Sequence, residues 1–258
     1  MHALVLKNVS KSFGGIDAVI KVDLSVTEGE SRALIGPNGA GKTTLFNLVT
    51  GEIPLDEGSI LLFGKDLTRQ PVQKRIASQL GRTYQVSNLF SQLTVQENLF
   101  LASWQTRRRK ASLAATLFRS WYKFENQRRH LAKIAHRVGL ENRLDITVDE
   151  LSHGEHRQLE LGITLAHEPR ILLLDEPMAG LSVAERGSMT ELIMSLKPEI
   201  TVVIIEHDID VAFSIADQVT VLHHGAIIAE GSPEQIENNR EVQQIYTLSR
   251  QSKDTHYA

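Results

Sequence analysis

The stretch that decides the fold lies at residues 36–43 and reads Gly36-Pro37-Asn38-Gly39-Ala40-Gly41-Lys42-Thr43. Two glycines stand five positions apart, and the second is followed by a lysine and a hydroxyl residue, which is the spacing of a phosphate-binding loop. An apolar run at residues 33–35 precedes the loop, and residues 43–50 continue as a predicted helix. This strand–loop–helix context supports phosphate binding over the alternative, a chance match in an ordinary turn.

Each residue type in this P-loop has a reason in phosphate chemistry. Glycines let backbone N–H groups turn toward phosphate oxygens without a Cβ clash, and the following helix points its positive end at the same anion. Lys42 is predicted to reach the β- and γ-phosphates, and the Thr43 hydroxyl to bind Mg²⁺. We therefore predict that the loop binds the phosphates of a nucleotide together with Mg²⁺. The predicted nucleotide-binding residues of the loop are Gly36, Pro37, Asn38, Gly39, Ala40, Gly41, Lys42, Thr43 and Thr44.

A second predicted site lies at the end of another strand. Residues 171–174 are uniformly apolar and lead into Asp175 and Glu176. Sheets of this class bind ligands at the carboxyl ends of their strands, where both carboxylates would lie. Asp175 is predicted to join the Mg²⁺ coordination sphere, usually through water, and Glu176 to polarise the water that attacks the nucleotide. An apolar strand that ends in two acids is common, so this prediction depends on its pairing with the P-loop.

The remaining pattern predicts an α/β fold. Alternating apolar residues at positions 18–26 indicate a half-buried strand, and residues 59–63 indicate another. Stripes at residues 113–121 and 131–138 have helical spacing. From residue 171 onward, buried strands alternate with helices, which is typical of a mostly parallel sheet. Ser232, Pro233 and Gln235 predict a helix start.

Composition narrows the possible functions. The chain has 258 residues, 41% of them hydrophobic, and no cysteine, which excludes disulfides, thiolate metal sites and cysteine nucleophiles. No apolar stretch approaches the roughly 20 residues that a bilayer span needs, and the first residues lack the pattern of a signal peptide. We therefore expect a cytosolic protein, or one that only its partners hold at a membrane.

The net charge of −3 conceals a basic segment at residues 104–137. Ten lysines and arginines there face one acid, so the segment carries +9 and the rest of the chain −12. A solvated helical face is the plainest interpretation. The alternatives are a surface that meets anionic lipids or an acidic part of a permease, and a nucleic-acid site, which no readout motif supports.

With these motifs in place, the whole chain resembles the ATP-binding subunits of ABC transporters. The stretch Leu151-Ser152-His153-Gly154-Glu155 resembles the ABC signature, usually Leu-Ser-Gly-Gly-Gln. Gln85 matches the Q-loop glutamine, His207 resembles the switch histidine, and Phe13 resembles the aromatic residue that stacks on adenine. The resemblance implies catalytic roles for Glu176, His207 and Gln85. It also implies metal binding by Thr43, Gln85 and Asp175, and nucleotide contacts from Phe13, Ser152 and Gly154.

The resemblance also implies an architecture and partners. The expected fold is a P-loop NTPase of the ABC type with an N-terminal antiparallel β part and an inserted α-helical subdomain. Residues 1–85 and 151–258 would form the catalytic core, and residues 86–150 the helical subdomain. A second ATP-binding subunit, identical or related, would sandwich two ATP molecules. Integral-membrane permease subunits and, indirectly, an extracytoplasmic binding protein would complete a complex at the cytoplasmic face of the membrane.

Departures from the family pattern narrow the resemblance further. His153 and Glu155 replace a glycine and a glutamine of the signature, and Ser182 replaces the D-loop aspartate, which puts its inter-subunit contact in doubt. The sequence at residues 151–158 and 175–181 is similar to the corresponding motifs of ATPases that power branched-chain amino acid uptake. Urea or short-amide importers and lipopolysaccharide exporters are the related alternatives. A soluble ABC protein that acts on nucleic acid or in assembly is the alternative of a different class.

Two histidine pairs are candidate metal ligands. His153 and His156 stand three positions apart, a spacing that suits two ligands on one helix face, but no further ligands accompany them. His223 and His224 precede Gly225, where a plain turn is the better interpretation. We therefore predict no metal site at either pair.

Overall fold

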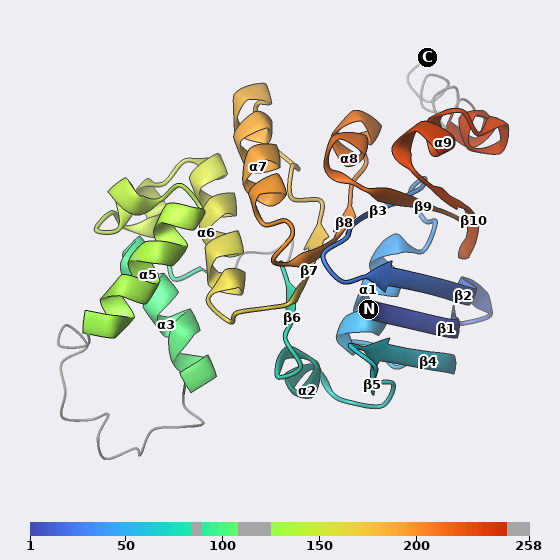
Figure 1. Ribbon diagram of the computed structural model, residues 1–258, viewed down its shortest axis with the longest axis horizontal. Coiled ribbons are helices and arrows are strands. Elements are labelled where there is room, and N and C mark those ends of the chain that lie inside the picture. Colours follow the sequence, from blue (N-terminus) through green and yellow to red (C-terminus); the bar gives the residue numbers. More distant parts are fainter. Residues whose placement is uncertain (84–88, 108–124, 247–258) are drawn as a thin grey trace. The chain divides into compact units, whose positions relative to one another are not determined.

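The computed structural model describes residues 1–83, 89–107 and 125–246 (Figure 1). The chain divides into two compact units. The first comprises Met1–Arg82, Arg170–Glu176 and Ile193–Ala258, and the second comprises Thr83–Pro169 and Pro177–Leu192. The predicted helical subdomain, residues 86–150, falls in the second unit together with residues 151–169 and 177–192. Its boundaries stay a prediction.

One sheet of the first unit is antiparallel, as expected for the N-terminal part. Its strands follow the order β2-β1-β4-β5, with bounds β1 His2–Phe13, β2 Ile16–Thr27, β4 Glu57–Leu62 and β5 Lys65–Asp66. In Figure 1 these strands lie side by side in blue to teal. Leu4 pairs with Val26 on one side and with Leu62 on the other. The three side chains are buried, so this sheet presents one apolar face to a core.

The alternation predicted for residues 18–26 holds only from Val22 to Val26. Ile20 is 39% exposed, and its neighbour Val19 is buried instead. The register between β1 and β2 shifts at this point, and Lys21 has a left-handed φ of 45°. A bulge of this kind adds one residue to a strand and moves the side chains beyond it to the opposite faces. The prediction was therefore wrong for Ile20.

The second sheet is mostly parallel, as predicted. Its order is β10-β9-β3-β8-β7-β6, and β10 pairs with β9 in the antiparallel sense while all other pairs are parallel. The strands are β3 Ser31–Ile35, β6 Leu80–Arg82, β7 Ile171–Asp175, β8 Thr201–Ile205, β9 Gln218–His223 and β10 Ala226–Gly231. Every residue of β3, β7 and β8 is buried. Strands that are buried along their whole length, with apolar residues at most positions, are typical of central parallel strands that are covered on both faces.

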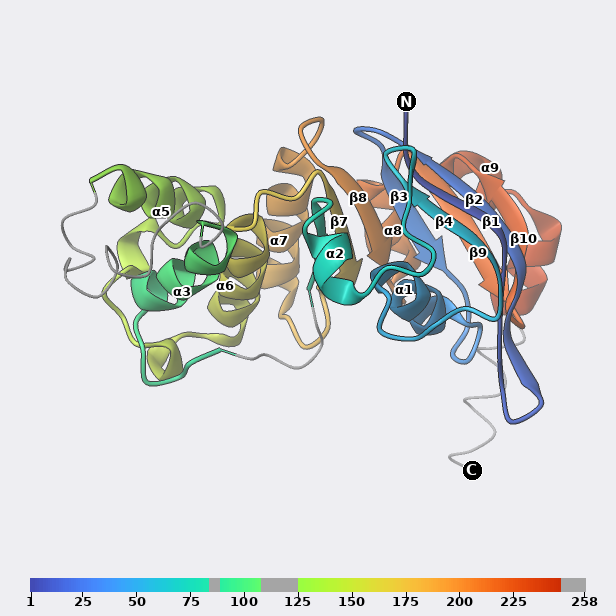
Figure 2. The same cartoon turned by 90° about the horizontal axis from the view of Figure 1, so that it is seen from below.

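The core of the first unit lies between its two sheets, beside helix α1 (Lys42–Thr50; Figure 2). Leu45, Phe46, Leu48 and Val49 of this helix are at most 3% exposed and share one buried cluster with residues of both sheets. Burial of this kind contributes about 25 cal/mol per Å² of apolar surface. The helix that follows the P-loop is thereby fixed by packing along its length.

Short helices complete the first unit: α2 Val72–Ile76, α8 Ile209–Ile215 and α9 Pro233–Glu237. The predicted helix start at Ser232 is confirmed. The hydroxyl of Ser232 accepts a hydrogen bond from the N–H of Gln235, and the side chain of Gln235 binds the backbone of Ser232 in return. His224 and Gly225 form the turn between β9 and β10, as predicted, with φ angles of 48° and 79°.

The second unit is helical. Helices α3 (Val95–Arg107), α5 (Glu125–Arg137) and α6 (His153–Leu165) pack together, with 3₁₀ turns at Glu141–Arg143 and Val148–Glu150. The apolar stripe predicted at residues 131–138 is buried, and Gly162 lets α6 approach Leu99 and Val138 closely. The stripe predicted at residues 113–121 and half of the basic segment, residues 108–124, lie outside the described residues.

Helix α7 (Val183–Ser195) begins in the second unit and ends in the first. In the described part of the chain, no helix is both long and apolar enough to cross a bilayer.

Arg75 of α2 stabilises the end of α1. Its Nη1 donates to the carbonyl oxygens of Leu48 and Val49 at 2.7 Å each, and its other nitrogens donate to those of Gln70 and Thr68 at 2.9 and 3.1 Å. The last carbonyls of a helix have no partner within the helix, and a cation there also suits the helix dipole. A buried arginine thus satisfies the C-terminal end of the helix that begins at the P-loop.

We predict that Arg75→Met lowers the free energy of unfolding by roughly 2–4 kcal/mol, because it leaves buried carbonyls without donors. Urea unfolding followed by circular dichroism measures this change. Lys74→Met is the matched control, since Lys74 is the exposed neighbour on the same helix, and it should change stability by less than about 0.5 kcal/mol. Equal effects of the two variants would contradict the capping role of Arg75.

Candidate functional site

The loop between β3 and α1 has the backbone that the P-loop prediction requires. Gly36, Gly39 and Gly41 have positive φ angles of 148°, 78° and 103°. A Cβ on Gly36 would lie 2.1 Å from the carbonyl oxygen of Leu222, and one on Gly41 would lie 2.3 Å from that of Ala18. Gly41 is also the N-cap of α1 and has no side chain to bond the first helical amides. The helix N-terminus is therefore left to an external anion.

Lys42 folds back across this loop. Its Nζ donates to the carbonyl oxygens of Gly36 at 2.7 Å and Pro37 at 3.1 Å, and the residue is 6% exposed. Burial lowers the pKa of Lys42, while the nearby charges of Glu176 and Asp175 act in the opposite direction. The ammonium group thus lies inside the loop, near the acidic end of β7.

The other residues of the loop differ in exposure. Asn38, Gly39 and Thr43 are exposed, Pro37 and Thr44 are partly exposed, and Ala40 is buried. The Thr43 hydroxyl is thus accessible at the mouth of the loop, as a metal ligand would need to be.

Asp175 is the last residue of β7, and its side chain is 2% exposed. Its Oδ2 accepts a hydrogen bond of 2.9 Å from Nη2 of Arg82. Its Oδ1 is buried and has no hydrogen-bond partner among the described residues. Burial raises the pKa of Asp175, and the hydrogen bond and charge of Arg82 counteract this rise. A buried oxygen without a donor is a place where a cation would be stabilised.

Glu176 and His207 face each other at the ends of neighbouring strands. The Nε2 of His207 lies 2.6 Å from Oε1 of Glu176, and the N–H of Glu176 donates to the carbonyl oxygen of Ile205, the last residue of β8. Glu176 has a left-handed φ of 51°, which is uncommon for a residue other than glycine. Both side chains are partly exposed. The imidazole therefore orients a carboxylate that remains accessible to water.

These residues suit Mg²⁺. The Thr43 hydroxyl and the orphaned Oδ1 of Asp175 are hard oxygen donors, and a magnesium ion usually takes only one or two protein oxygens together with water and phosphate. The described residues contain no group of three or more histidines or acids that could hold a metal by themselves.

The signature residues lie in the second unit, at the start of α6. Ser152 is the N-cap of this helix, as predicted: its Oγ accepts from the N–H of Glu155, and Glu155 Oε2 accepts from the N–H of Ser152 at 2.8 Å. Arg143 binds the other oxygen of Glu155 at 2.7 Å. This reciprocal capping gives Glu155, where glutamine is usual, a structural role at the positive end of the helix.

Glu185 joins the signature to the segment around Ser182. The N–H of Gly154 donates to Glu185 Oε1 at 3.1 Å, and the Ser182 hydroxyl donates to Glu185 Oε2 at 2.7 Å. A Cβ on Gly154 would lie 2.6 Å from that Oε1. His153 Nε2 lies 3.4 Å from the carbonyl oxygen of Ala179. The residues that depart from the family pattern, at positions 153 and 182, therefore belong to one network in the second unit.

The structure thus brings most of the predicted site residues together in one unit. The P-loop, Asp175, Glu176 and His207 all lie at the carboxyl ends of β3, β7 and β8 in the first unit. Phe13 ends β1 in the same unit, where its ring is 47% exposed and lies 5.3 Å from Lys11 Nζ. Gln85 lies outside the described residues.

Two polar residues of these networks were missed by the sequence reasoning. Glu185 lies on α7, and no motif marks it. Arg82 stands three positions before Gln85, and an arginine beside a predicted metal-site residue was the signal that could have drawn attention to it. The hydrogen bonds of Arg82 with Asp175 and of Glu185 with Gly154 join segments that are distant in sequence.

Comparisons with known proteins show which family the chain belongs to. A family model described as ABC transporter matches residues 19–179. The chain is 37% identical to the high-affinity branched-chain amino acid transport ATP-binding proteins BraF of Pseudomonas aeruginosa and LivG of Escherichia coli, over 94% of this chain and 96% of each relative. A solved ATP-binding cassette of an ABC transporter, in its ADP conformation, is 30% identical with a TM-score of 0.83. That comparison covers 96% of this chain and 99% of the other.

The resemblance to ABC transporter ATP-binding subunits, which rested on the sequence motifs, is therefore confirmed. The predicted α/β fold class is confirmed as well. The family model spans most of the chain, the relatives are matched over nearly their full length, and the P-loop and the acidic strand end stand together in the structure. The chain belongs to the ABC transporter family, as one of its ATP-hydrolysing, nucleotide-binding proteins.

Proposed function

We propose that this chain is the ATP-binding subunit of a membrane importer for branched-chain amino acids. The observation that carries the choice of cargo is the near full-length similarity to BraF and LivG, whose names specify that transport. The departures at positions 153, 155 and 182 support the same branch of the family. Import of urea or short amides is the alternative within that branch.

In this proposal the nucleotide lies across the P-loop. Backbone N–H groups of the residues from Gly36 to Thr44, apart from Pro37, would surround its phosphates, Lys42 would leave the carbonyl oxygens of the loop to bind the β- and γ-phosphates, and Phe13 would stack on the adenine. Thr43, Asp175 and Gln85 would hold Mg²⁺, directly or through water. When bound, Mg²⁺ neutralises charge that develops on the phosphate oxygens.

The hydrolytic step is assigned to Glu176 and His207. The Glu176 carboxylate accepts a proton from the attacking water as the water oxygen bonds to the γ-phosphorus and the bond to the leaving oxygen breaks. His207, 2.6 Å from that carboxylate, orients it. Asp175 is unsuited to act as the base because its side chain is only 2% exposed, with Oδ2 held by Arg82 and Oδ1 assigned to Mg²⁺, whereas the Glu176 carboxylate is accessible to water.

The proposal also includes a second ATP-binding subunit. Ser152 and Gly154 would contact the nucleotide on the opposite subunit, so that closure of the pair depends on ATP. The related ABC transporter subunits support this arrangement, together with permease subunits that carry the membrane spans and an extracytoplasmic binding protein that selects the cargo. The chain would then lie at the cytoplasmic face of the membrane as a peripheral subunit.

We predict that Glu176→Gln retains ATP binding but slows hydrolysis by roughly a hundredfold or more, the usual contribution of a general base. Lys42→Ala should instead weaken ATP binding by roughly tenfold or more, because it removes a charge-assisted contact to phosphate. Binding of a fluorescent ATP analogue and release of phosphate measure the two effects separately. A Glu176→Gln protein that hydrolyses ATP at the wild-type rate would refute the assignment of the base.

A second prediction concerns assembly. Glu176→Gln protein with ATP and Mg²⁺ should double in mass by light scattering, alone or with a related ATP-binding subunit, and Lys42→Ala under the same conditions should not. The complex purified from membranes should contain permease subunits. A persistent monomer in both cases would argue against the sandwich, and recovery with nucleic acid in a salt-sensitive complex would favour the soluble class of ABC protein.

A further inference from the structure

Arg82 connects the acidic strand end to the helix that follows the P-loop. It is the last residue of β6, and its side chain is 7% exposed. Nη2 donates to Asp175 Oδ2 at 2.9 Å, and Nη1 donates to Asn47 Oδ1 at 2.6 Å. The guanidinium group thus bridges β7 and α1 within the first unit. We propose that Arg82 is a positioning residue for the Mg²⁺ site, and this inference depends on the proposed binding of Mg²⁺ by Thr43 and Asp175.

The two oxygens of the Asp175 carboxylate have different surroundings. Oδ2 is held by Arg82, whereas Oδ1 is buried and lacks a partner among the described residues. A carboxylate that is free to rotate would present either oxygen to a cation. With Oδ2 fixed by a charged hydrogen bond, only Oδ1 is left for the metal or its bound water.

Arg82 is itself held in place by residues of α1 and of the segment just after it. Besides Asn47, its Nη1 lies within 3.2 Å of Glu52 Oε1 and 3.3 Å of Thr50 Oγ1. These three residues lie at or just beyond the C-terminal end of α1, and the guanidinium carbon is 5.8 Å from the ring centroid of Phe46 on the same helix. The side chain is therefore held from both sides and cannot follow Asp175 if that carboxylate turns.

Helix α1 also carries Thr43, the other proposed metal ligand. Lys42 and Thr43 form its first turn. Because Arg82 binds the far end of this rigid helix and Asp175 at once, it fixes the carboxylate relative to the element that bears Thr43. A lysine at position 82 would keep the positive charge, but its single nitrogen lacks the planar fork that reaches both sides. The role we assign therefore depends on geometry as well as on charge.

The test measures Mg²⁺-dependent nucleotide binding without turnover. A fluorescent ADP analogue is titrated with MgCl₂ in the wild-type protein and in Arg82→Ala. We expect the Mg²⁺ concentration at half-maximal binding to rise roughly tenfold, the usual cost of losing a partner of a metal-binding carboxylate. Binding of the analogue in EDTA should change by less than about twofold, because the residues that Arg82 contacts at these distances, Asp175 and residues 46–52 of α1 and its end, lie outside the P-loop. Arg82→Lys should shift the midpoint in the same direction by roughly threefold or more.

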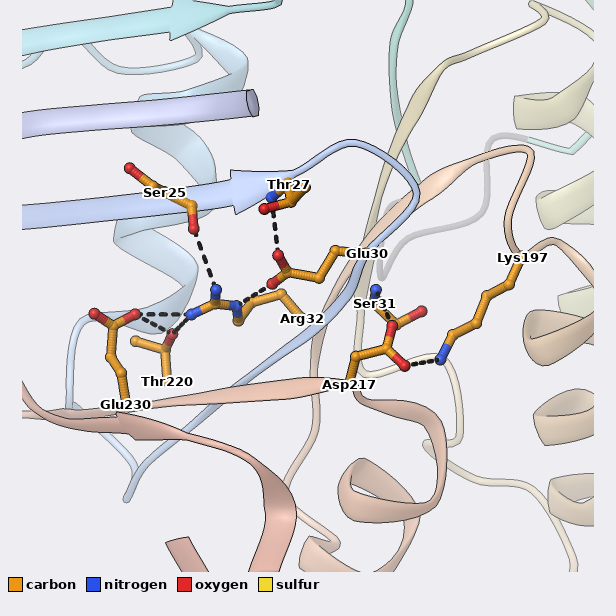
Figure 3. A network of polar contacts seen from close by, with 9 residues as sticks. All are labelled: Ser25, Thr27, Glu30, Ser31, Arg32, Lys197, Asp217, Thr220 and Glu230. Atoms are coloured by element: carbon orange, nitrogen blue, oxygen red, sulfur yellow. Dashed lines mark hydrogen bonds and ion pairs between the residues drawn. The ribbon is translucent and has the colours of Figure 1, made fainter. Parts of the chain in front are cut away.

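Arg32 provides a matched control in another network of the first unit (Figure 3). Its side chain is 8% exposed, and it donates to Glu30 Oε1, Glu230 Oε1, Thr220 Oγ1 and the carbonyl oxygen of Ser25 at 2.6–3.1 Å. It lies near the amino end of β3, opposite the strand edge that bears the P-loop. Arg32→Ala removes a buried arginine of similar connectivity, so it should lower thermal stability while leaving the Mg²⁺ midpoint unchanged.

An unchanged midpoint in Arg82→Ala, a midpoint at lower Mg²⁺, or an equal shift in Arg32→Ala would overturn the positioning role. A lower midpoint would mean that Arg82 competes with the cation for Asp175. If Arg82→Ala does not fold, Arg82→Lys decides the question by the same measurement. If the wild-type protein binds the analogue without any response to Mg²⁺, the proposed metal site itself is wrong, which is a separate failure.

Discussion

The structure depends on one steric constraint, the close approach of the P-loop backbone to its neighbours. Gly36 and Gly41 have no room for a Cβ, because carbonyl oxygens of Leu222 and Ala18 stand about 2 Å from where it would be. One contact comes from the parallel sheet and the other from the antiparallel sheet. Both sheets thus fix the loop from outside, and the start of α1 needs no side-chain cap and remains available to phosphate.

Charge is balanced around this loop by shared partners. Lys42 and Arg82 are cations, Asp175 and Glu176 are the acids nearby, and three of these four groups have little access to water. An unpaired buried charge costs several kcal/mol, so each must find partners before a nucleotide arrives. Lys42 finds carbonyl oxygens of its own loop, Asp175 finds Arg82, and Glu176 finds His207. Arg82 thus holds Oδ2 of Asp175 and leaves Oδ1 without a partner among the described residues.

The parts of this site that follow from sequence are those encoded locally. The P-loop spacing, the apolar strand that ends in Asp175 and the cap at Ser152 each depend on a few adjacent residues, and the structure has all three. The contacts of Arg82 and Glu185 depend on tertiary packing, and the burial of Ile20 was mispredicted because a bulge changes the register of β2. Local pattern specifies the elements, whereas partners across elements are set by how the chain folds back on itself.

The substitution at position 182 shows how a family contact changes without loss of polarity. The carboxylate usual at this position is absent, and the serine hydroxyl instead bonds Glu185, three residues later on α7. That glutamate also accepts the N–H of Gly154, in the signature. Hydrogen bonds from Ser182 and Gly154 lower the pKa of Glu185 from its usual value. The segment around residue 182 and the start of α6 are thus joined by an anion within one unit. The neighbouring His153, which replaces a glycine, lies close to Gly180, where a Cβ would stand 2.8 Å from its Nε2.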